Sequence, residues 1–170
     1  MEAVIQILIV GLITLAVLGF VGNLHQSTYE KTAAIVLESN LVAISSVIES
    51  DFNKIGYHAA KPAILRADSV FSFNADLRNN GTVQTVQYSK TIAQPNRDSA
   101  LCRSVSGESS IYSYVHVSKL NFAYFDSTGT PTSNLSAIRS VNVMIELANT
   151  SKTSSSISSL FWIKTFYIKN

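Results

Sequence analysis

Cysteine is nearly absent from this chain of 170 residues, because Cys102 is the only one. A single cysteine excludes an intrachain disulfide and any metal site built from several cysteines. Proline is almost as scarce, with three residues, and none of them precedes Pro62. Charged side chains are few and mixed: 13 Lys and Arg balance 11 Asp and Glu, and no basic run occurs. This charge distribution argues against a nucleic-acid-binding protein.

Charge is missing altogether between Ala3 and Leu24. As a helix these 22 residues would measure about 33 Å, which is enough to cross the apolar core of a bilayer. A cleaved signal peptide would instead begin with basic residues, have a shorter apolar run and end in a small-residue cleavage site. This segment follows Glu2 and ends in Gly-Asn-Leu-His. We therefore expect residues 1–25 to be retained as a transmembrane helix.

A second helical pattern follows over residues 29–57. Apolar residues recur there every three or four positions, which places them on one face of a helix. This expected packing face consists of Ala33, Leu37, Leu41, Ile44, Ile48, Phe52 and Ile55. Gly56, followed by Pro62, predicts the end of the helix. We expect an amphipathic helix over residues 26–57 that continues the transmembrane helix into a globular, β-rich head over residues 58–170.

The rest of the chain shows the alternating apolar pattern of β-strands. The expected strands cover residues 69–74, 82–88, 111–117, 119–125, 138–147 and 160–168. Between the first two lies a hairpin-turn signal, Asn80-Gly81, preceded by Asp76, since both residues of the pair tolerate positive φ. A second turn is predicted at Asp126–Gly129. The fold class is therefore α+β, with one long N-terminal helix packed against a C-terminal antiparallel β-sheet.

No motif of catalysis or metal binding stands out in the sequence. The three histidines are far apart and none has a metal-ligand spacing such as HExxH: His25, His58 and His116. Asp76, Asn79 and Asn80 could supply oxygen ligands to calcium, although a hairpin turn favours the same residues. GxSxG, P-loop and GxGxxG motifs do not occur. We expect neither an enzyme nor a bound metal or cofactor.

Several features follow one another in the order seen in type IV pilins, and the chain resembles that family. An apolar N-terminal helix with a glutamate near its start leads into an amphipathic half and a β-domain. The helix end has the sequence SDFNKIGY, and two later stretches, VSKLNFAYFDSTG and IRSVNVMIEL, are similar to the family's central strands. The family's hairpin pattern is matched by Phe73, Asp76, Leu77, Gly81, Val86 and Tyr88. Within the family, minor pilins and J-type pseudopilins are the most similar group.

The resemblance implies a structural subunit of a type IV pilus-like extracellular filament that polymerises through its apolar helix. Such a subunit would lie in the inner membrane before assembly and at the cell surface afterwards, with further copies of itself or other pilins as partners. Two alternatives stay open. The first alternative is a minor or tip pseudopilin that primes a pilus or a type II secretion system. The second is a monomeric single-pass membrane protein whose outer domain binds a ligand.

The expected assembly residues lie along the apolar helix. Gly11, Gly19 and Gly22 would let the backbones of neighbouring helices approach closely. Glu2 stands nearer the start of the chain than the glutamate of most pilins, and its role has two interpretations. In a filament core its carboxylate would need a partner, such as the amine of Met1 in a neighbouring subunit. In a lipid-embedded helix it would lie among the headgroups and need none.

Overall fold

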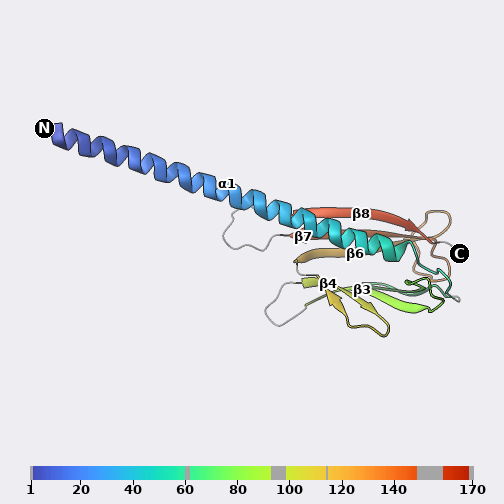
Figure 1. Ribbon diagram of the computed structural model, residues 1–170. Helices are drawn as coiled ribbons and strands as arrows, with labels where there is room; N and C mark the ends of the chain where they lie inside the picture. The colour runs from blue at the N-terminus through green and yellow to red at the C-terminus, as the bar shows by residue number, and fades with distance from the viewer. Residues whose placement is uncertain (1, 60–61, 93–98, 114, 149–158, 169–170) are drawn as a thin grey trace. The chain divides into compact units, whose positions relative to one another are not determined.

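The computed structural model describes residues 2–59, 62–92, 99–113, 115–148 and 159–168 (Figure 1). The chain divides into two compact units, Met1–Val36 and Leu37–Asn170. The first unit is helical throughout its described length. The second unit, which we call the head, contains the end of the same helix and all the strands in the described part of the chain.

Helix α1 begins at Glu2 and ends at Phe52. No proline interrupts it, so every backbone N–H beyond the first turn can take part in the helical hydrogen bonds. The predicted end at Gly56 is about one turn too late. After Phe52 the backbone tightens into i→i+3 hydrogen bonds, such as that from Lys54 N–H to the Asp51 carbonyl at 3.0 Å. Gly56 then adopts a φ of 76°, which glycine reaches without strain, and the chain turns away from the helix.

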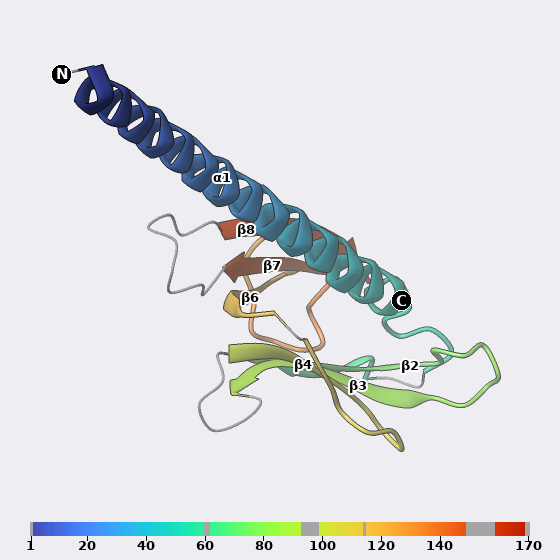
Figure 2. The same cartoon turned by 60° about the vertical axis from the view of Figure 1, so that its left-hand side comes forward.

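The strands of the head form two antiparallel sheets, which are seen together in Figure 2. Sheet A has the order β1-β2-β3-β4-β5 and consists of β1 (Ile64–Ala67), β2 (Val70–Ala75), β3 (Gln84–Ile92), β4 (Ser99–Val105) and β5 (Ile111–Tyr112). Sheet B has the order β6-β7-β8 and consists of β6 (Val117–Phe125), β7 (Ser140–Ala148) and β8 (Ser159–Tyr167). The predicted α+β class, with a long helix packed against antiparallel strands, is confirmed.

The strand predictions differ from the structure in the number of strands, in the number of sheets and in one strand's extent. Strands β1 and β4 are additional, and the one predicted sheet is two. The predicted strand over residues 111–117 is confirmed only at its start, because β5 ends at Tyr112 and the last backbone hydrogen bond to β4 in the described residues is that from Ser113 N–H to the Leu101 carbonyl. Val117 pairs with Leu147 in sheet B instead. A segment that crosses between two sheets cannot keep one continuous ladder of hydrogen bonds.

The core of the head forms around the last turn of α1. The ring of Phe52 lies 5.2–5.5 Å, centroid to centroid, from the rings of Phe71, Phe73 and Tyr88 in sheet A. It also lies 5.0 Å from Phe166 in sheet B. The predicted packing residues within the head all belong to this core or pack against it: Leu37, Leu41, Ile44, Ile48, Phe52 and Ile55. One face of the helix thus holds both sheets together.

Candidate assembly surface

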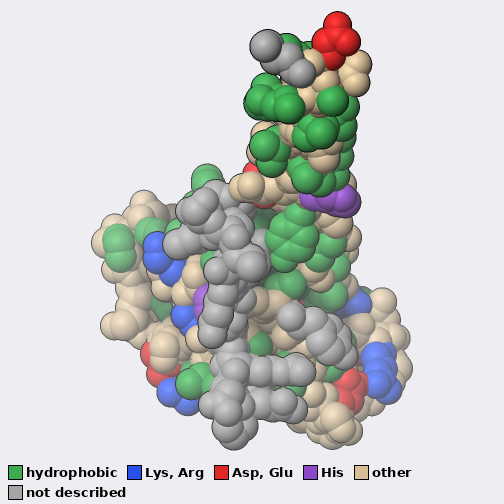
Figure 3. Space-filling model, turned by 90° about the vertical axis from the view of Figure 1, so that its left-hand side faces the viewer, with side chains coloured by type: hydrophobic (Ala, Val, Ile, Leu, Met, Phe, Trp, Pro, Cys, Tyr) green, Lys and Arg blue, Asp and Glu red, His purple; other side chains and the backbone are tan. Residues whose placement is uncertain are grey.

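The first unit consists of a helix that carries many exposed apolar side chains. Every described residue from Glu2 to Thr32 is exposed. The helix is long and apolar enough to cross a membrane, judged by length and composition, and none of its most apolar window is buried. Figure 3 shows hydrophobic side chains along the side of this part of the helix that faces the viewer. Since exposed apolar area is unfavourable in water, this segment requires a lipid or protein environment.

The predicted assembly residues lie on this uncovered helix, except Met1, which is outside the described residues. A Cβ atom added at Gly11, Gly19 or Gly22 would meet nothing within 4 Å. The structure of the single chain therefore gives no reason for glycine at these positions. At about 100° per residue the three glycines fall within an arc of about 80°, so a neighbouring helix could approach all of them from one side.

Glu2 lies in the first turn of α1 and is exposed. A carboxylate at a helix N-terminus interacts favourably with the helix dipole and the free N–H groups of the first turn. This local effect explains an acidic residue here without any neighbouring subunit. Both interpretations of Glu2 remain compatible with the position that the structure gives it.

Within the head, α1 has a second side, uncharged and exposed, that faces away from the core. We call it the outward face, and it consists of Ser39, Val42, Ala43, Ser46, Val47 and Ser50. All six residues are exposed, and they fall within an arc of about 140° that contains no charged side chain. Val42 is 62% and Val47 is 47% exposed. The charged residues Glu38 and Glu49 lie together beyond one edge of this arc.

The outward face was not predicted from the sequence. The sequence indicates an amphipathic helix here, and its periodic apolar residues predict one packing face but no role for the opposite side. The signal was nevertheless present, because valine, alanine and serine occupy the wheel positions where a solvent-facing helix usually carries lysine and glutamate. The outward face therefore carries uncharged side chains, and Glu38 and Glu49 lie outside it.

A buried ion pair fixes the end of α1 to sheet A. The Asp51 carboxylate accepts hydrogen bonds from Arg103 Nε at 2.7 Å and Arg103 Nη2 at 3.2 Å. The Tyr88 hydroxyl donates a third hydrogen bond to Asp51. Asp51 is buried and the Arg103 side chain is only 17% exposed. The hydrogen bonds to Asp51 raise the pKa of Arg103, whereas burial and then the Asp51 charge raise the pKa of Tyr88.

The predicted hairpin turn is a longer loop organised by a buried carboxylate. Asp76 is fully buried and accepts hydrogen bonds from the backbone N–H of Asn80 at 3.2 Å and of Gly81 at 2.8 Å. His58 Nδ1 lies 3.4 Å from the same carboxylate. The expectation of positive φ at the Asn80-Gly81 pair is half right, since Asn79 and Gly81 have φ values of 54° and 80°.

These contacts assign Asp76 to loop structure. Burial acts to raise the pKa of Asp76, but the hydrogen bonds from Gly81, Asn80 and His58 outweigh it and lower the pKa. The carboxylate oxygens are thus engaged by backbone donors, as in a turn and not as in a calcium site. No group of three or more His, Cys, Asp or Glu side chains suited to a metal ion occurs among the described residues.

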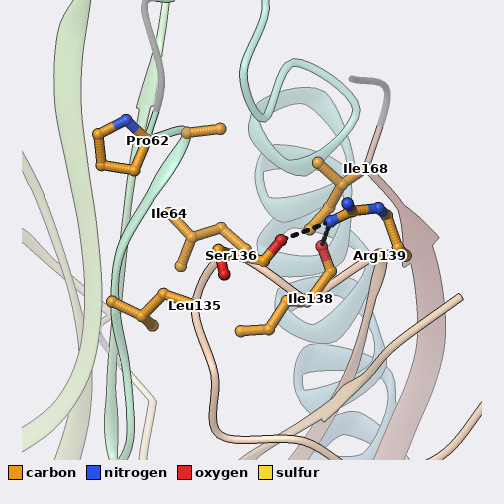
Figure 4. A pocket seen from close by; sticks show the side chains of 8 residues that line it. Pro62, Ile64, Leu135, Ser136, Ile138, Arg139 and Ile168 are labelled. Carbon is orange, nitrogen blue, oxygen red and sulfur yellow. Dashed lines mark hydrogen bonds between the residues drawn. The ribbon is translucent and has the colours of Figure 1, made fainter.

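A pocket of about 430 Å³ lies beside the end of β8 in the head (Figure 4). Its walls are mostly aliphatic and include Ile64, Ile138 and Ile168. Arg139 Nη1 is held by two backbone carbonyls, those of Ser136 at 2.8 Å and Ile138 at 2.9 Å. The guanidinium therefore closes the loop before β7. The described residues that line this pocket provide no carboxylate, imidazole or thiol for acid–base or nucleophilic chemistry.

Comparisons with protein-family models, with curated proteins and with solved structures find no match. The apolar N-terminal helix followed by antiparallel sheets is consistent with a pilin-like fold. That likeness rests on architecture, on the order of the elements and on the motifs quoted above.

Proposed function

We propose that this chain is a structural subunit of a type IV pilus-like filament, and that it assembles through α1. The membrane anchors the subunit before assembly, and the apolar helices of neighbouring subunits replace the lipid afterwards. The role is structural and requires no catalysis. Its partners are further copies of the chain or related pilins.

The observation that carries this proposal is the outward face of α1. A bilayer core about 30 Å thick is spanned by about 20 residues, and the segment Ala3–Leu24 already supplies them. A simple anchor has no use for a further uncharged and exposed helix surface such as Val42 and Val47 inside the head. Packing of helices against each other does use one, because close contact rewards small and apolar side chains.

The same observation weighs against a monomeric protein with a ligand-binding outer domain. In such a protein the helix would face water on the side opposite the core, and charged residues would be favoured there. The head instead keeps Glu38 and Glu49 off the outward face. The sequence motifs favour the pilin group, and the filament explains why the side of the helix opposite its packing stripe is uncharged.

The proposal is tested by separating membrane anchoring from assembly. Three forms are compared: the full chain, a form that lacks Met1–Gln26, and a form in which Ala3–Leu24 is replaced by 22 leucines. We expect the full chain to form filaments and the shortened form to be a soluble, folded monomer. The polyleucine form should insert into membranes without assembling, because it lacks the glycines. Filaments of native diameter from the shortened form would overturn the proposal.

A further inference from the structure

A groove in the head runs alongside the outward face of α1. It has a volume of about 240 Å³ and lies between the helix and the edge of sheet A. The helix contributes Ala43, Ile44 and Val47, and the sheet contributes Leu101, Ile111 and Tyr112. Ile111 and Tyr112 belong to β5, a strand of two residues at the end of the sheet. The walls are thus mostly apolar on both sides.

Two polar side chains among the described residues that line this groove, Arg103 and Ser113, are engaged within the head. Arg103 lines it, but its charge is balanced by Asp51 through two hydrogen bonds. The Ser113 hydroxyl donates to the Val115 carbonyl and accepts from Leu101 N–H. Since Arg103 is the one charged side chain among the described residues that line the groove, an occupant gains little from a charge of its own. The volume also falls below the range of about 300–1,000 Å³ in which small-molecule pockets lie. These properties fit a few apolar side chains of a protein.

We propose that this groove receives the apolar segment Ala3–Leu24 of a second copy of the chain. This inference rests on the proposed filament and names the surface of the head that contacts the apolar helix. Ala43 and Val47 belong both to the groove and to the outward face, so a helix that packs on the outward face has one flank over the groove. The segment presents exposed valine, isoleucine and leucine side chains and no charge, which matches the neutral groove.

Disulfide crosslinking tests this contact in assembled filaments. The background variant is Cys102→Ser, because Cys102 is the one native thiol. Ile111→Cys is then combined with single cysteines placed in turn from Val4 to Leu24, and sheared filaments are oxidised. We expect crosslinked dimers at positions that repeat every three or four residues, and none in detergent-dispersed subunits. The control, Phe161→Cys on the other sheet, is also well exposed and should give no such periodic pattern.

A second variant fills the groove without removing any contact. Ala43→Trp should reduce filament yield at least fivefold, whereas Glu38→Trp, on the charged side of the same helix, should assemble as the wild type does. Thermal unfolding of both variants shows that the head is folded. Normal assembly of Ala43→Trp, or filaments in which Ile111→Cys never crosslinks to the segment, would overturn the inference and leave the filament standing. A lipid or another protein in the groove would give the same negative result. Absence of wild-type filaments would instead overturn the proposed function.

Discussion

Asp51, Tyr88 and Arg103 show what single residues do for this head. The three side chains come from α1, β3 and β4, and their hydrogen bonds join the helix to the sheet at the point where the helix ends. A buried ion pair contributes little net stability compared with apolar packing, but loss of one partner leaves the other buried and uncompensated. The network therefore fixes the position of the helix end more than it stabilises the fold.

Removal of one partner from this network should be costly. We predict that Asp51→Ala lowers the free energy of unfolding of the head by about 3–5 kcal/mol, because Arg103 stays behind without its counterion. Tyr88→Phe should cost only about 1 kcal/mol, since it removes one hydrogen bond. Urea unfolding of residues 27–170 measures both values. The double variant Asp51→Leu with Arg103→Met should recover much of the loss, and a double variant as unstable as Asp51→Ala would contradict this account.

Asp76 predicts how stability depends on pH. Its pKa is lowered in the folded head, so the unfolded chain, with an Asp pKa of about 3.9, binds more protons in acid. The stabilisation is therefore present above about pH 4 and is lost as the pH falls through the folded pKa. We predict that Asp76→Asn has a smaller decrease in urea midpoint between pH 6 and pH 3 than the wild type. His58 faces this carboxylate, and His58→Ala is the control for its share. Equal decreases in wild type and Asp76→Asn would refute the prediction.

Glu2 provides the residue-scale test of assembly. Its carboxylate can reach the headgroups when the subunit is in a membrane, but among packed apolar helices it needs a cation from a neighbour. We predict that Glu2→Gln inserts into membranes at the wild-type level and yields fewer filaments. Membrane fractions and sheared filaments are compared by immunoblot. Equal filament yield would leave Glu2 as a headgroup residue that also interacts with the helix dipole.

At the scale of elements, α1 packs on one side and remains uncovered on the other. The packing side holds Phe52 against both sheets, whereas the outward side presents valine and serine to its surroundings. An exposed surface substitution normally changes stability by less than about 0.5 kcal/mol. Variants on the outward face can therefore separate folding from assembly.

We predict that Val42→Lys leaves the thermal midpoint of the head within about 2 °C of the wild type, because the side chain is already exposed. The same variant should strongly reduce filament yield, since a lysine would be buried without a partner between helices. Glu38→Lys, beyond the edge of the outward face, is the matched control and should assemble. If Val42→Lys assembles as well as Glu38→Lys, the outward face has no role in packing.

Several elements were predictable from the sequence because their signals are local. Period-four apolar residues predicted α1, and the alternating patterns around Asn80-Gly81 predicted β2 and β3. Strand β4 was not predicted because Arg103 interrupts its apolar pattern. The residue that neutralises the charge of Arg103, Asp51, lies far away in the chain. The division of the strands into two sheets was not predictable for a related reason. Strand partners are chosen by tertiary packing, which alternation within one strand does not encode.

In the candidate assembly surface too, the features with local sequence signals were predictable and those formed by tertiary packing were not. The apolar segment Ala3–Leu24 was evident from composition alone, and its glycines were candidates for close packing from the start. The groove beside the outward face was not predictable, because Leu101 and Ile111 meet Ala43 only once the sheet has formed. The outward face could have been found by asking where charge is missing on the helical wheel rather than where apolar residues gather.

At the scale of the whole molecule, the chain combines a folded head with a helix that needs a different environment. The head has its own buried core around Phe52, whereas the apolar segment contributes no buried residue in the described chain. Hydrophobic burial within one subunit therefore stabilises the head alone. The segment gains its contacts from a membrane or from other subunits. We propose that in the assembled filament it contacts other subunits.

Electron cryomicroscopy of filaments sheared from cells that express the chain is the direct test of whether the apolar segment contacts other subunits. A helical reconstruction that resolves side chains shows which residues surround each apolar segment. We predict that Ala3–Leu24 of every subunit lies at the filament axis against the α1 helices of its neighbours, and that the outward face is covered by protein. Filaments in which Ala3–Leu24 is exposed to solvent, or cells in which the chain stays a membrane-bound monomer, would contradict the account.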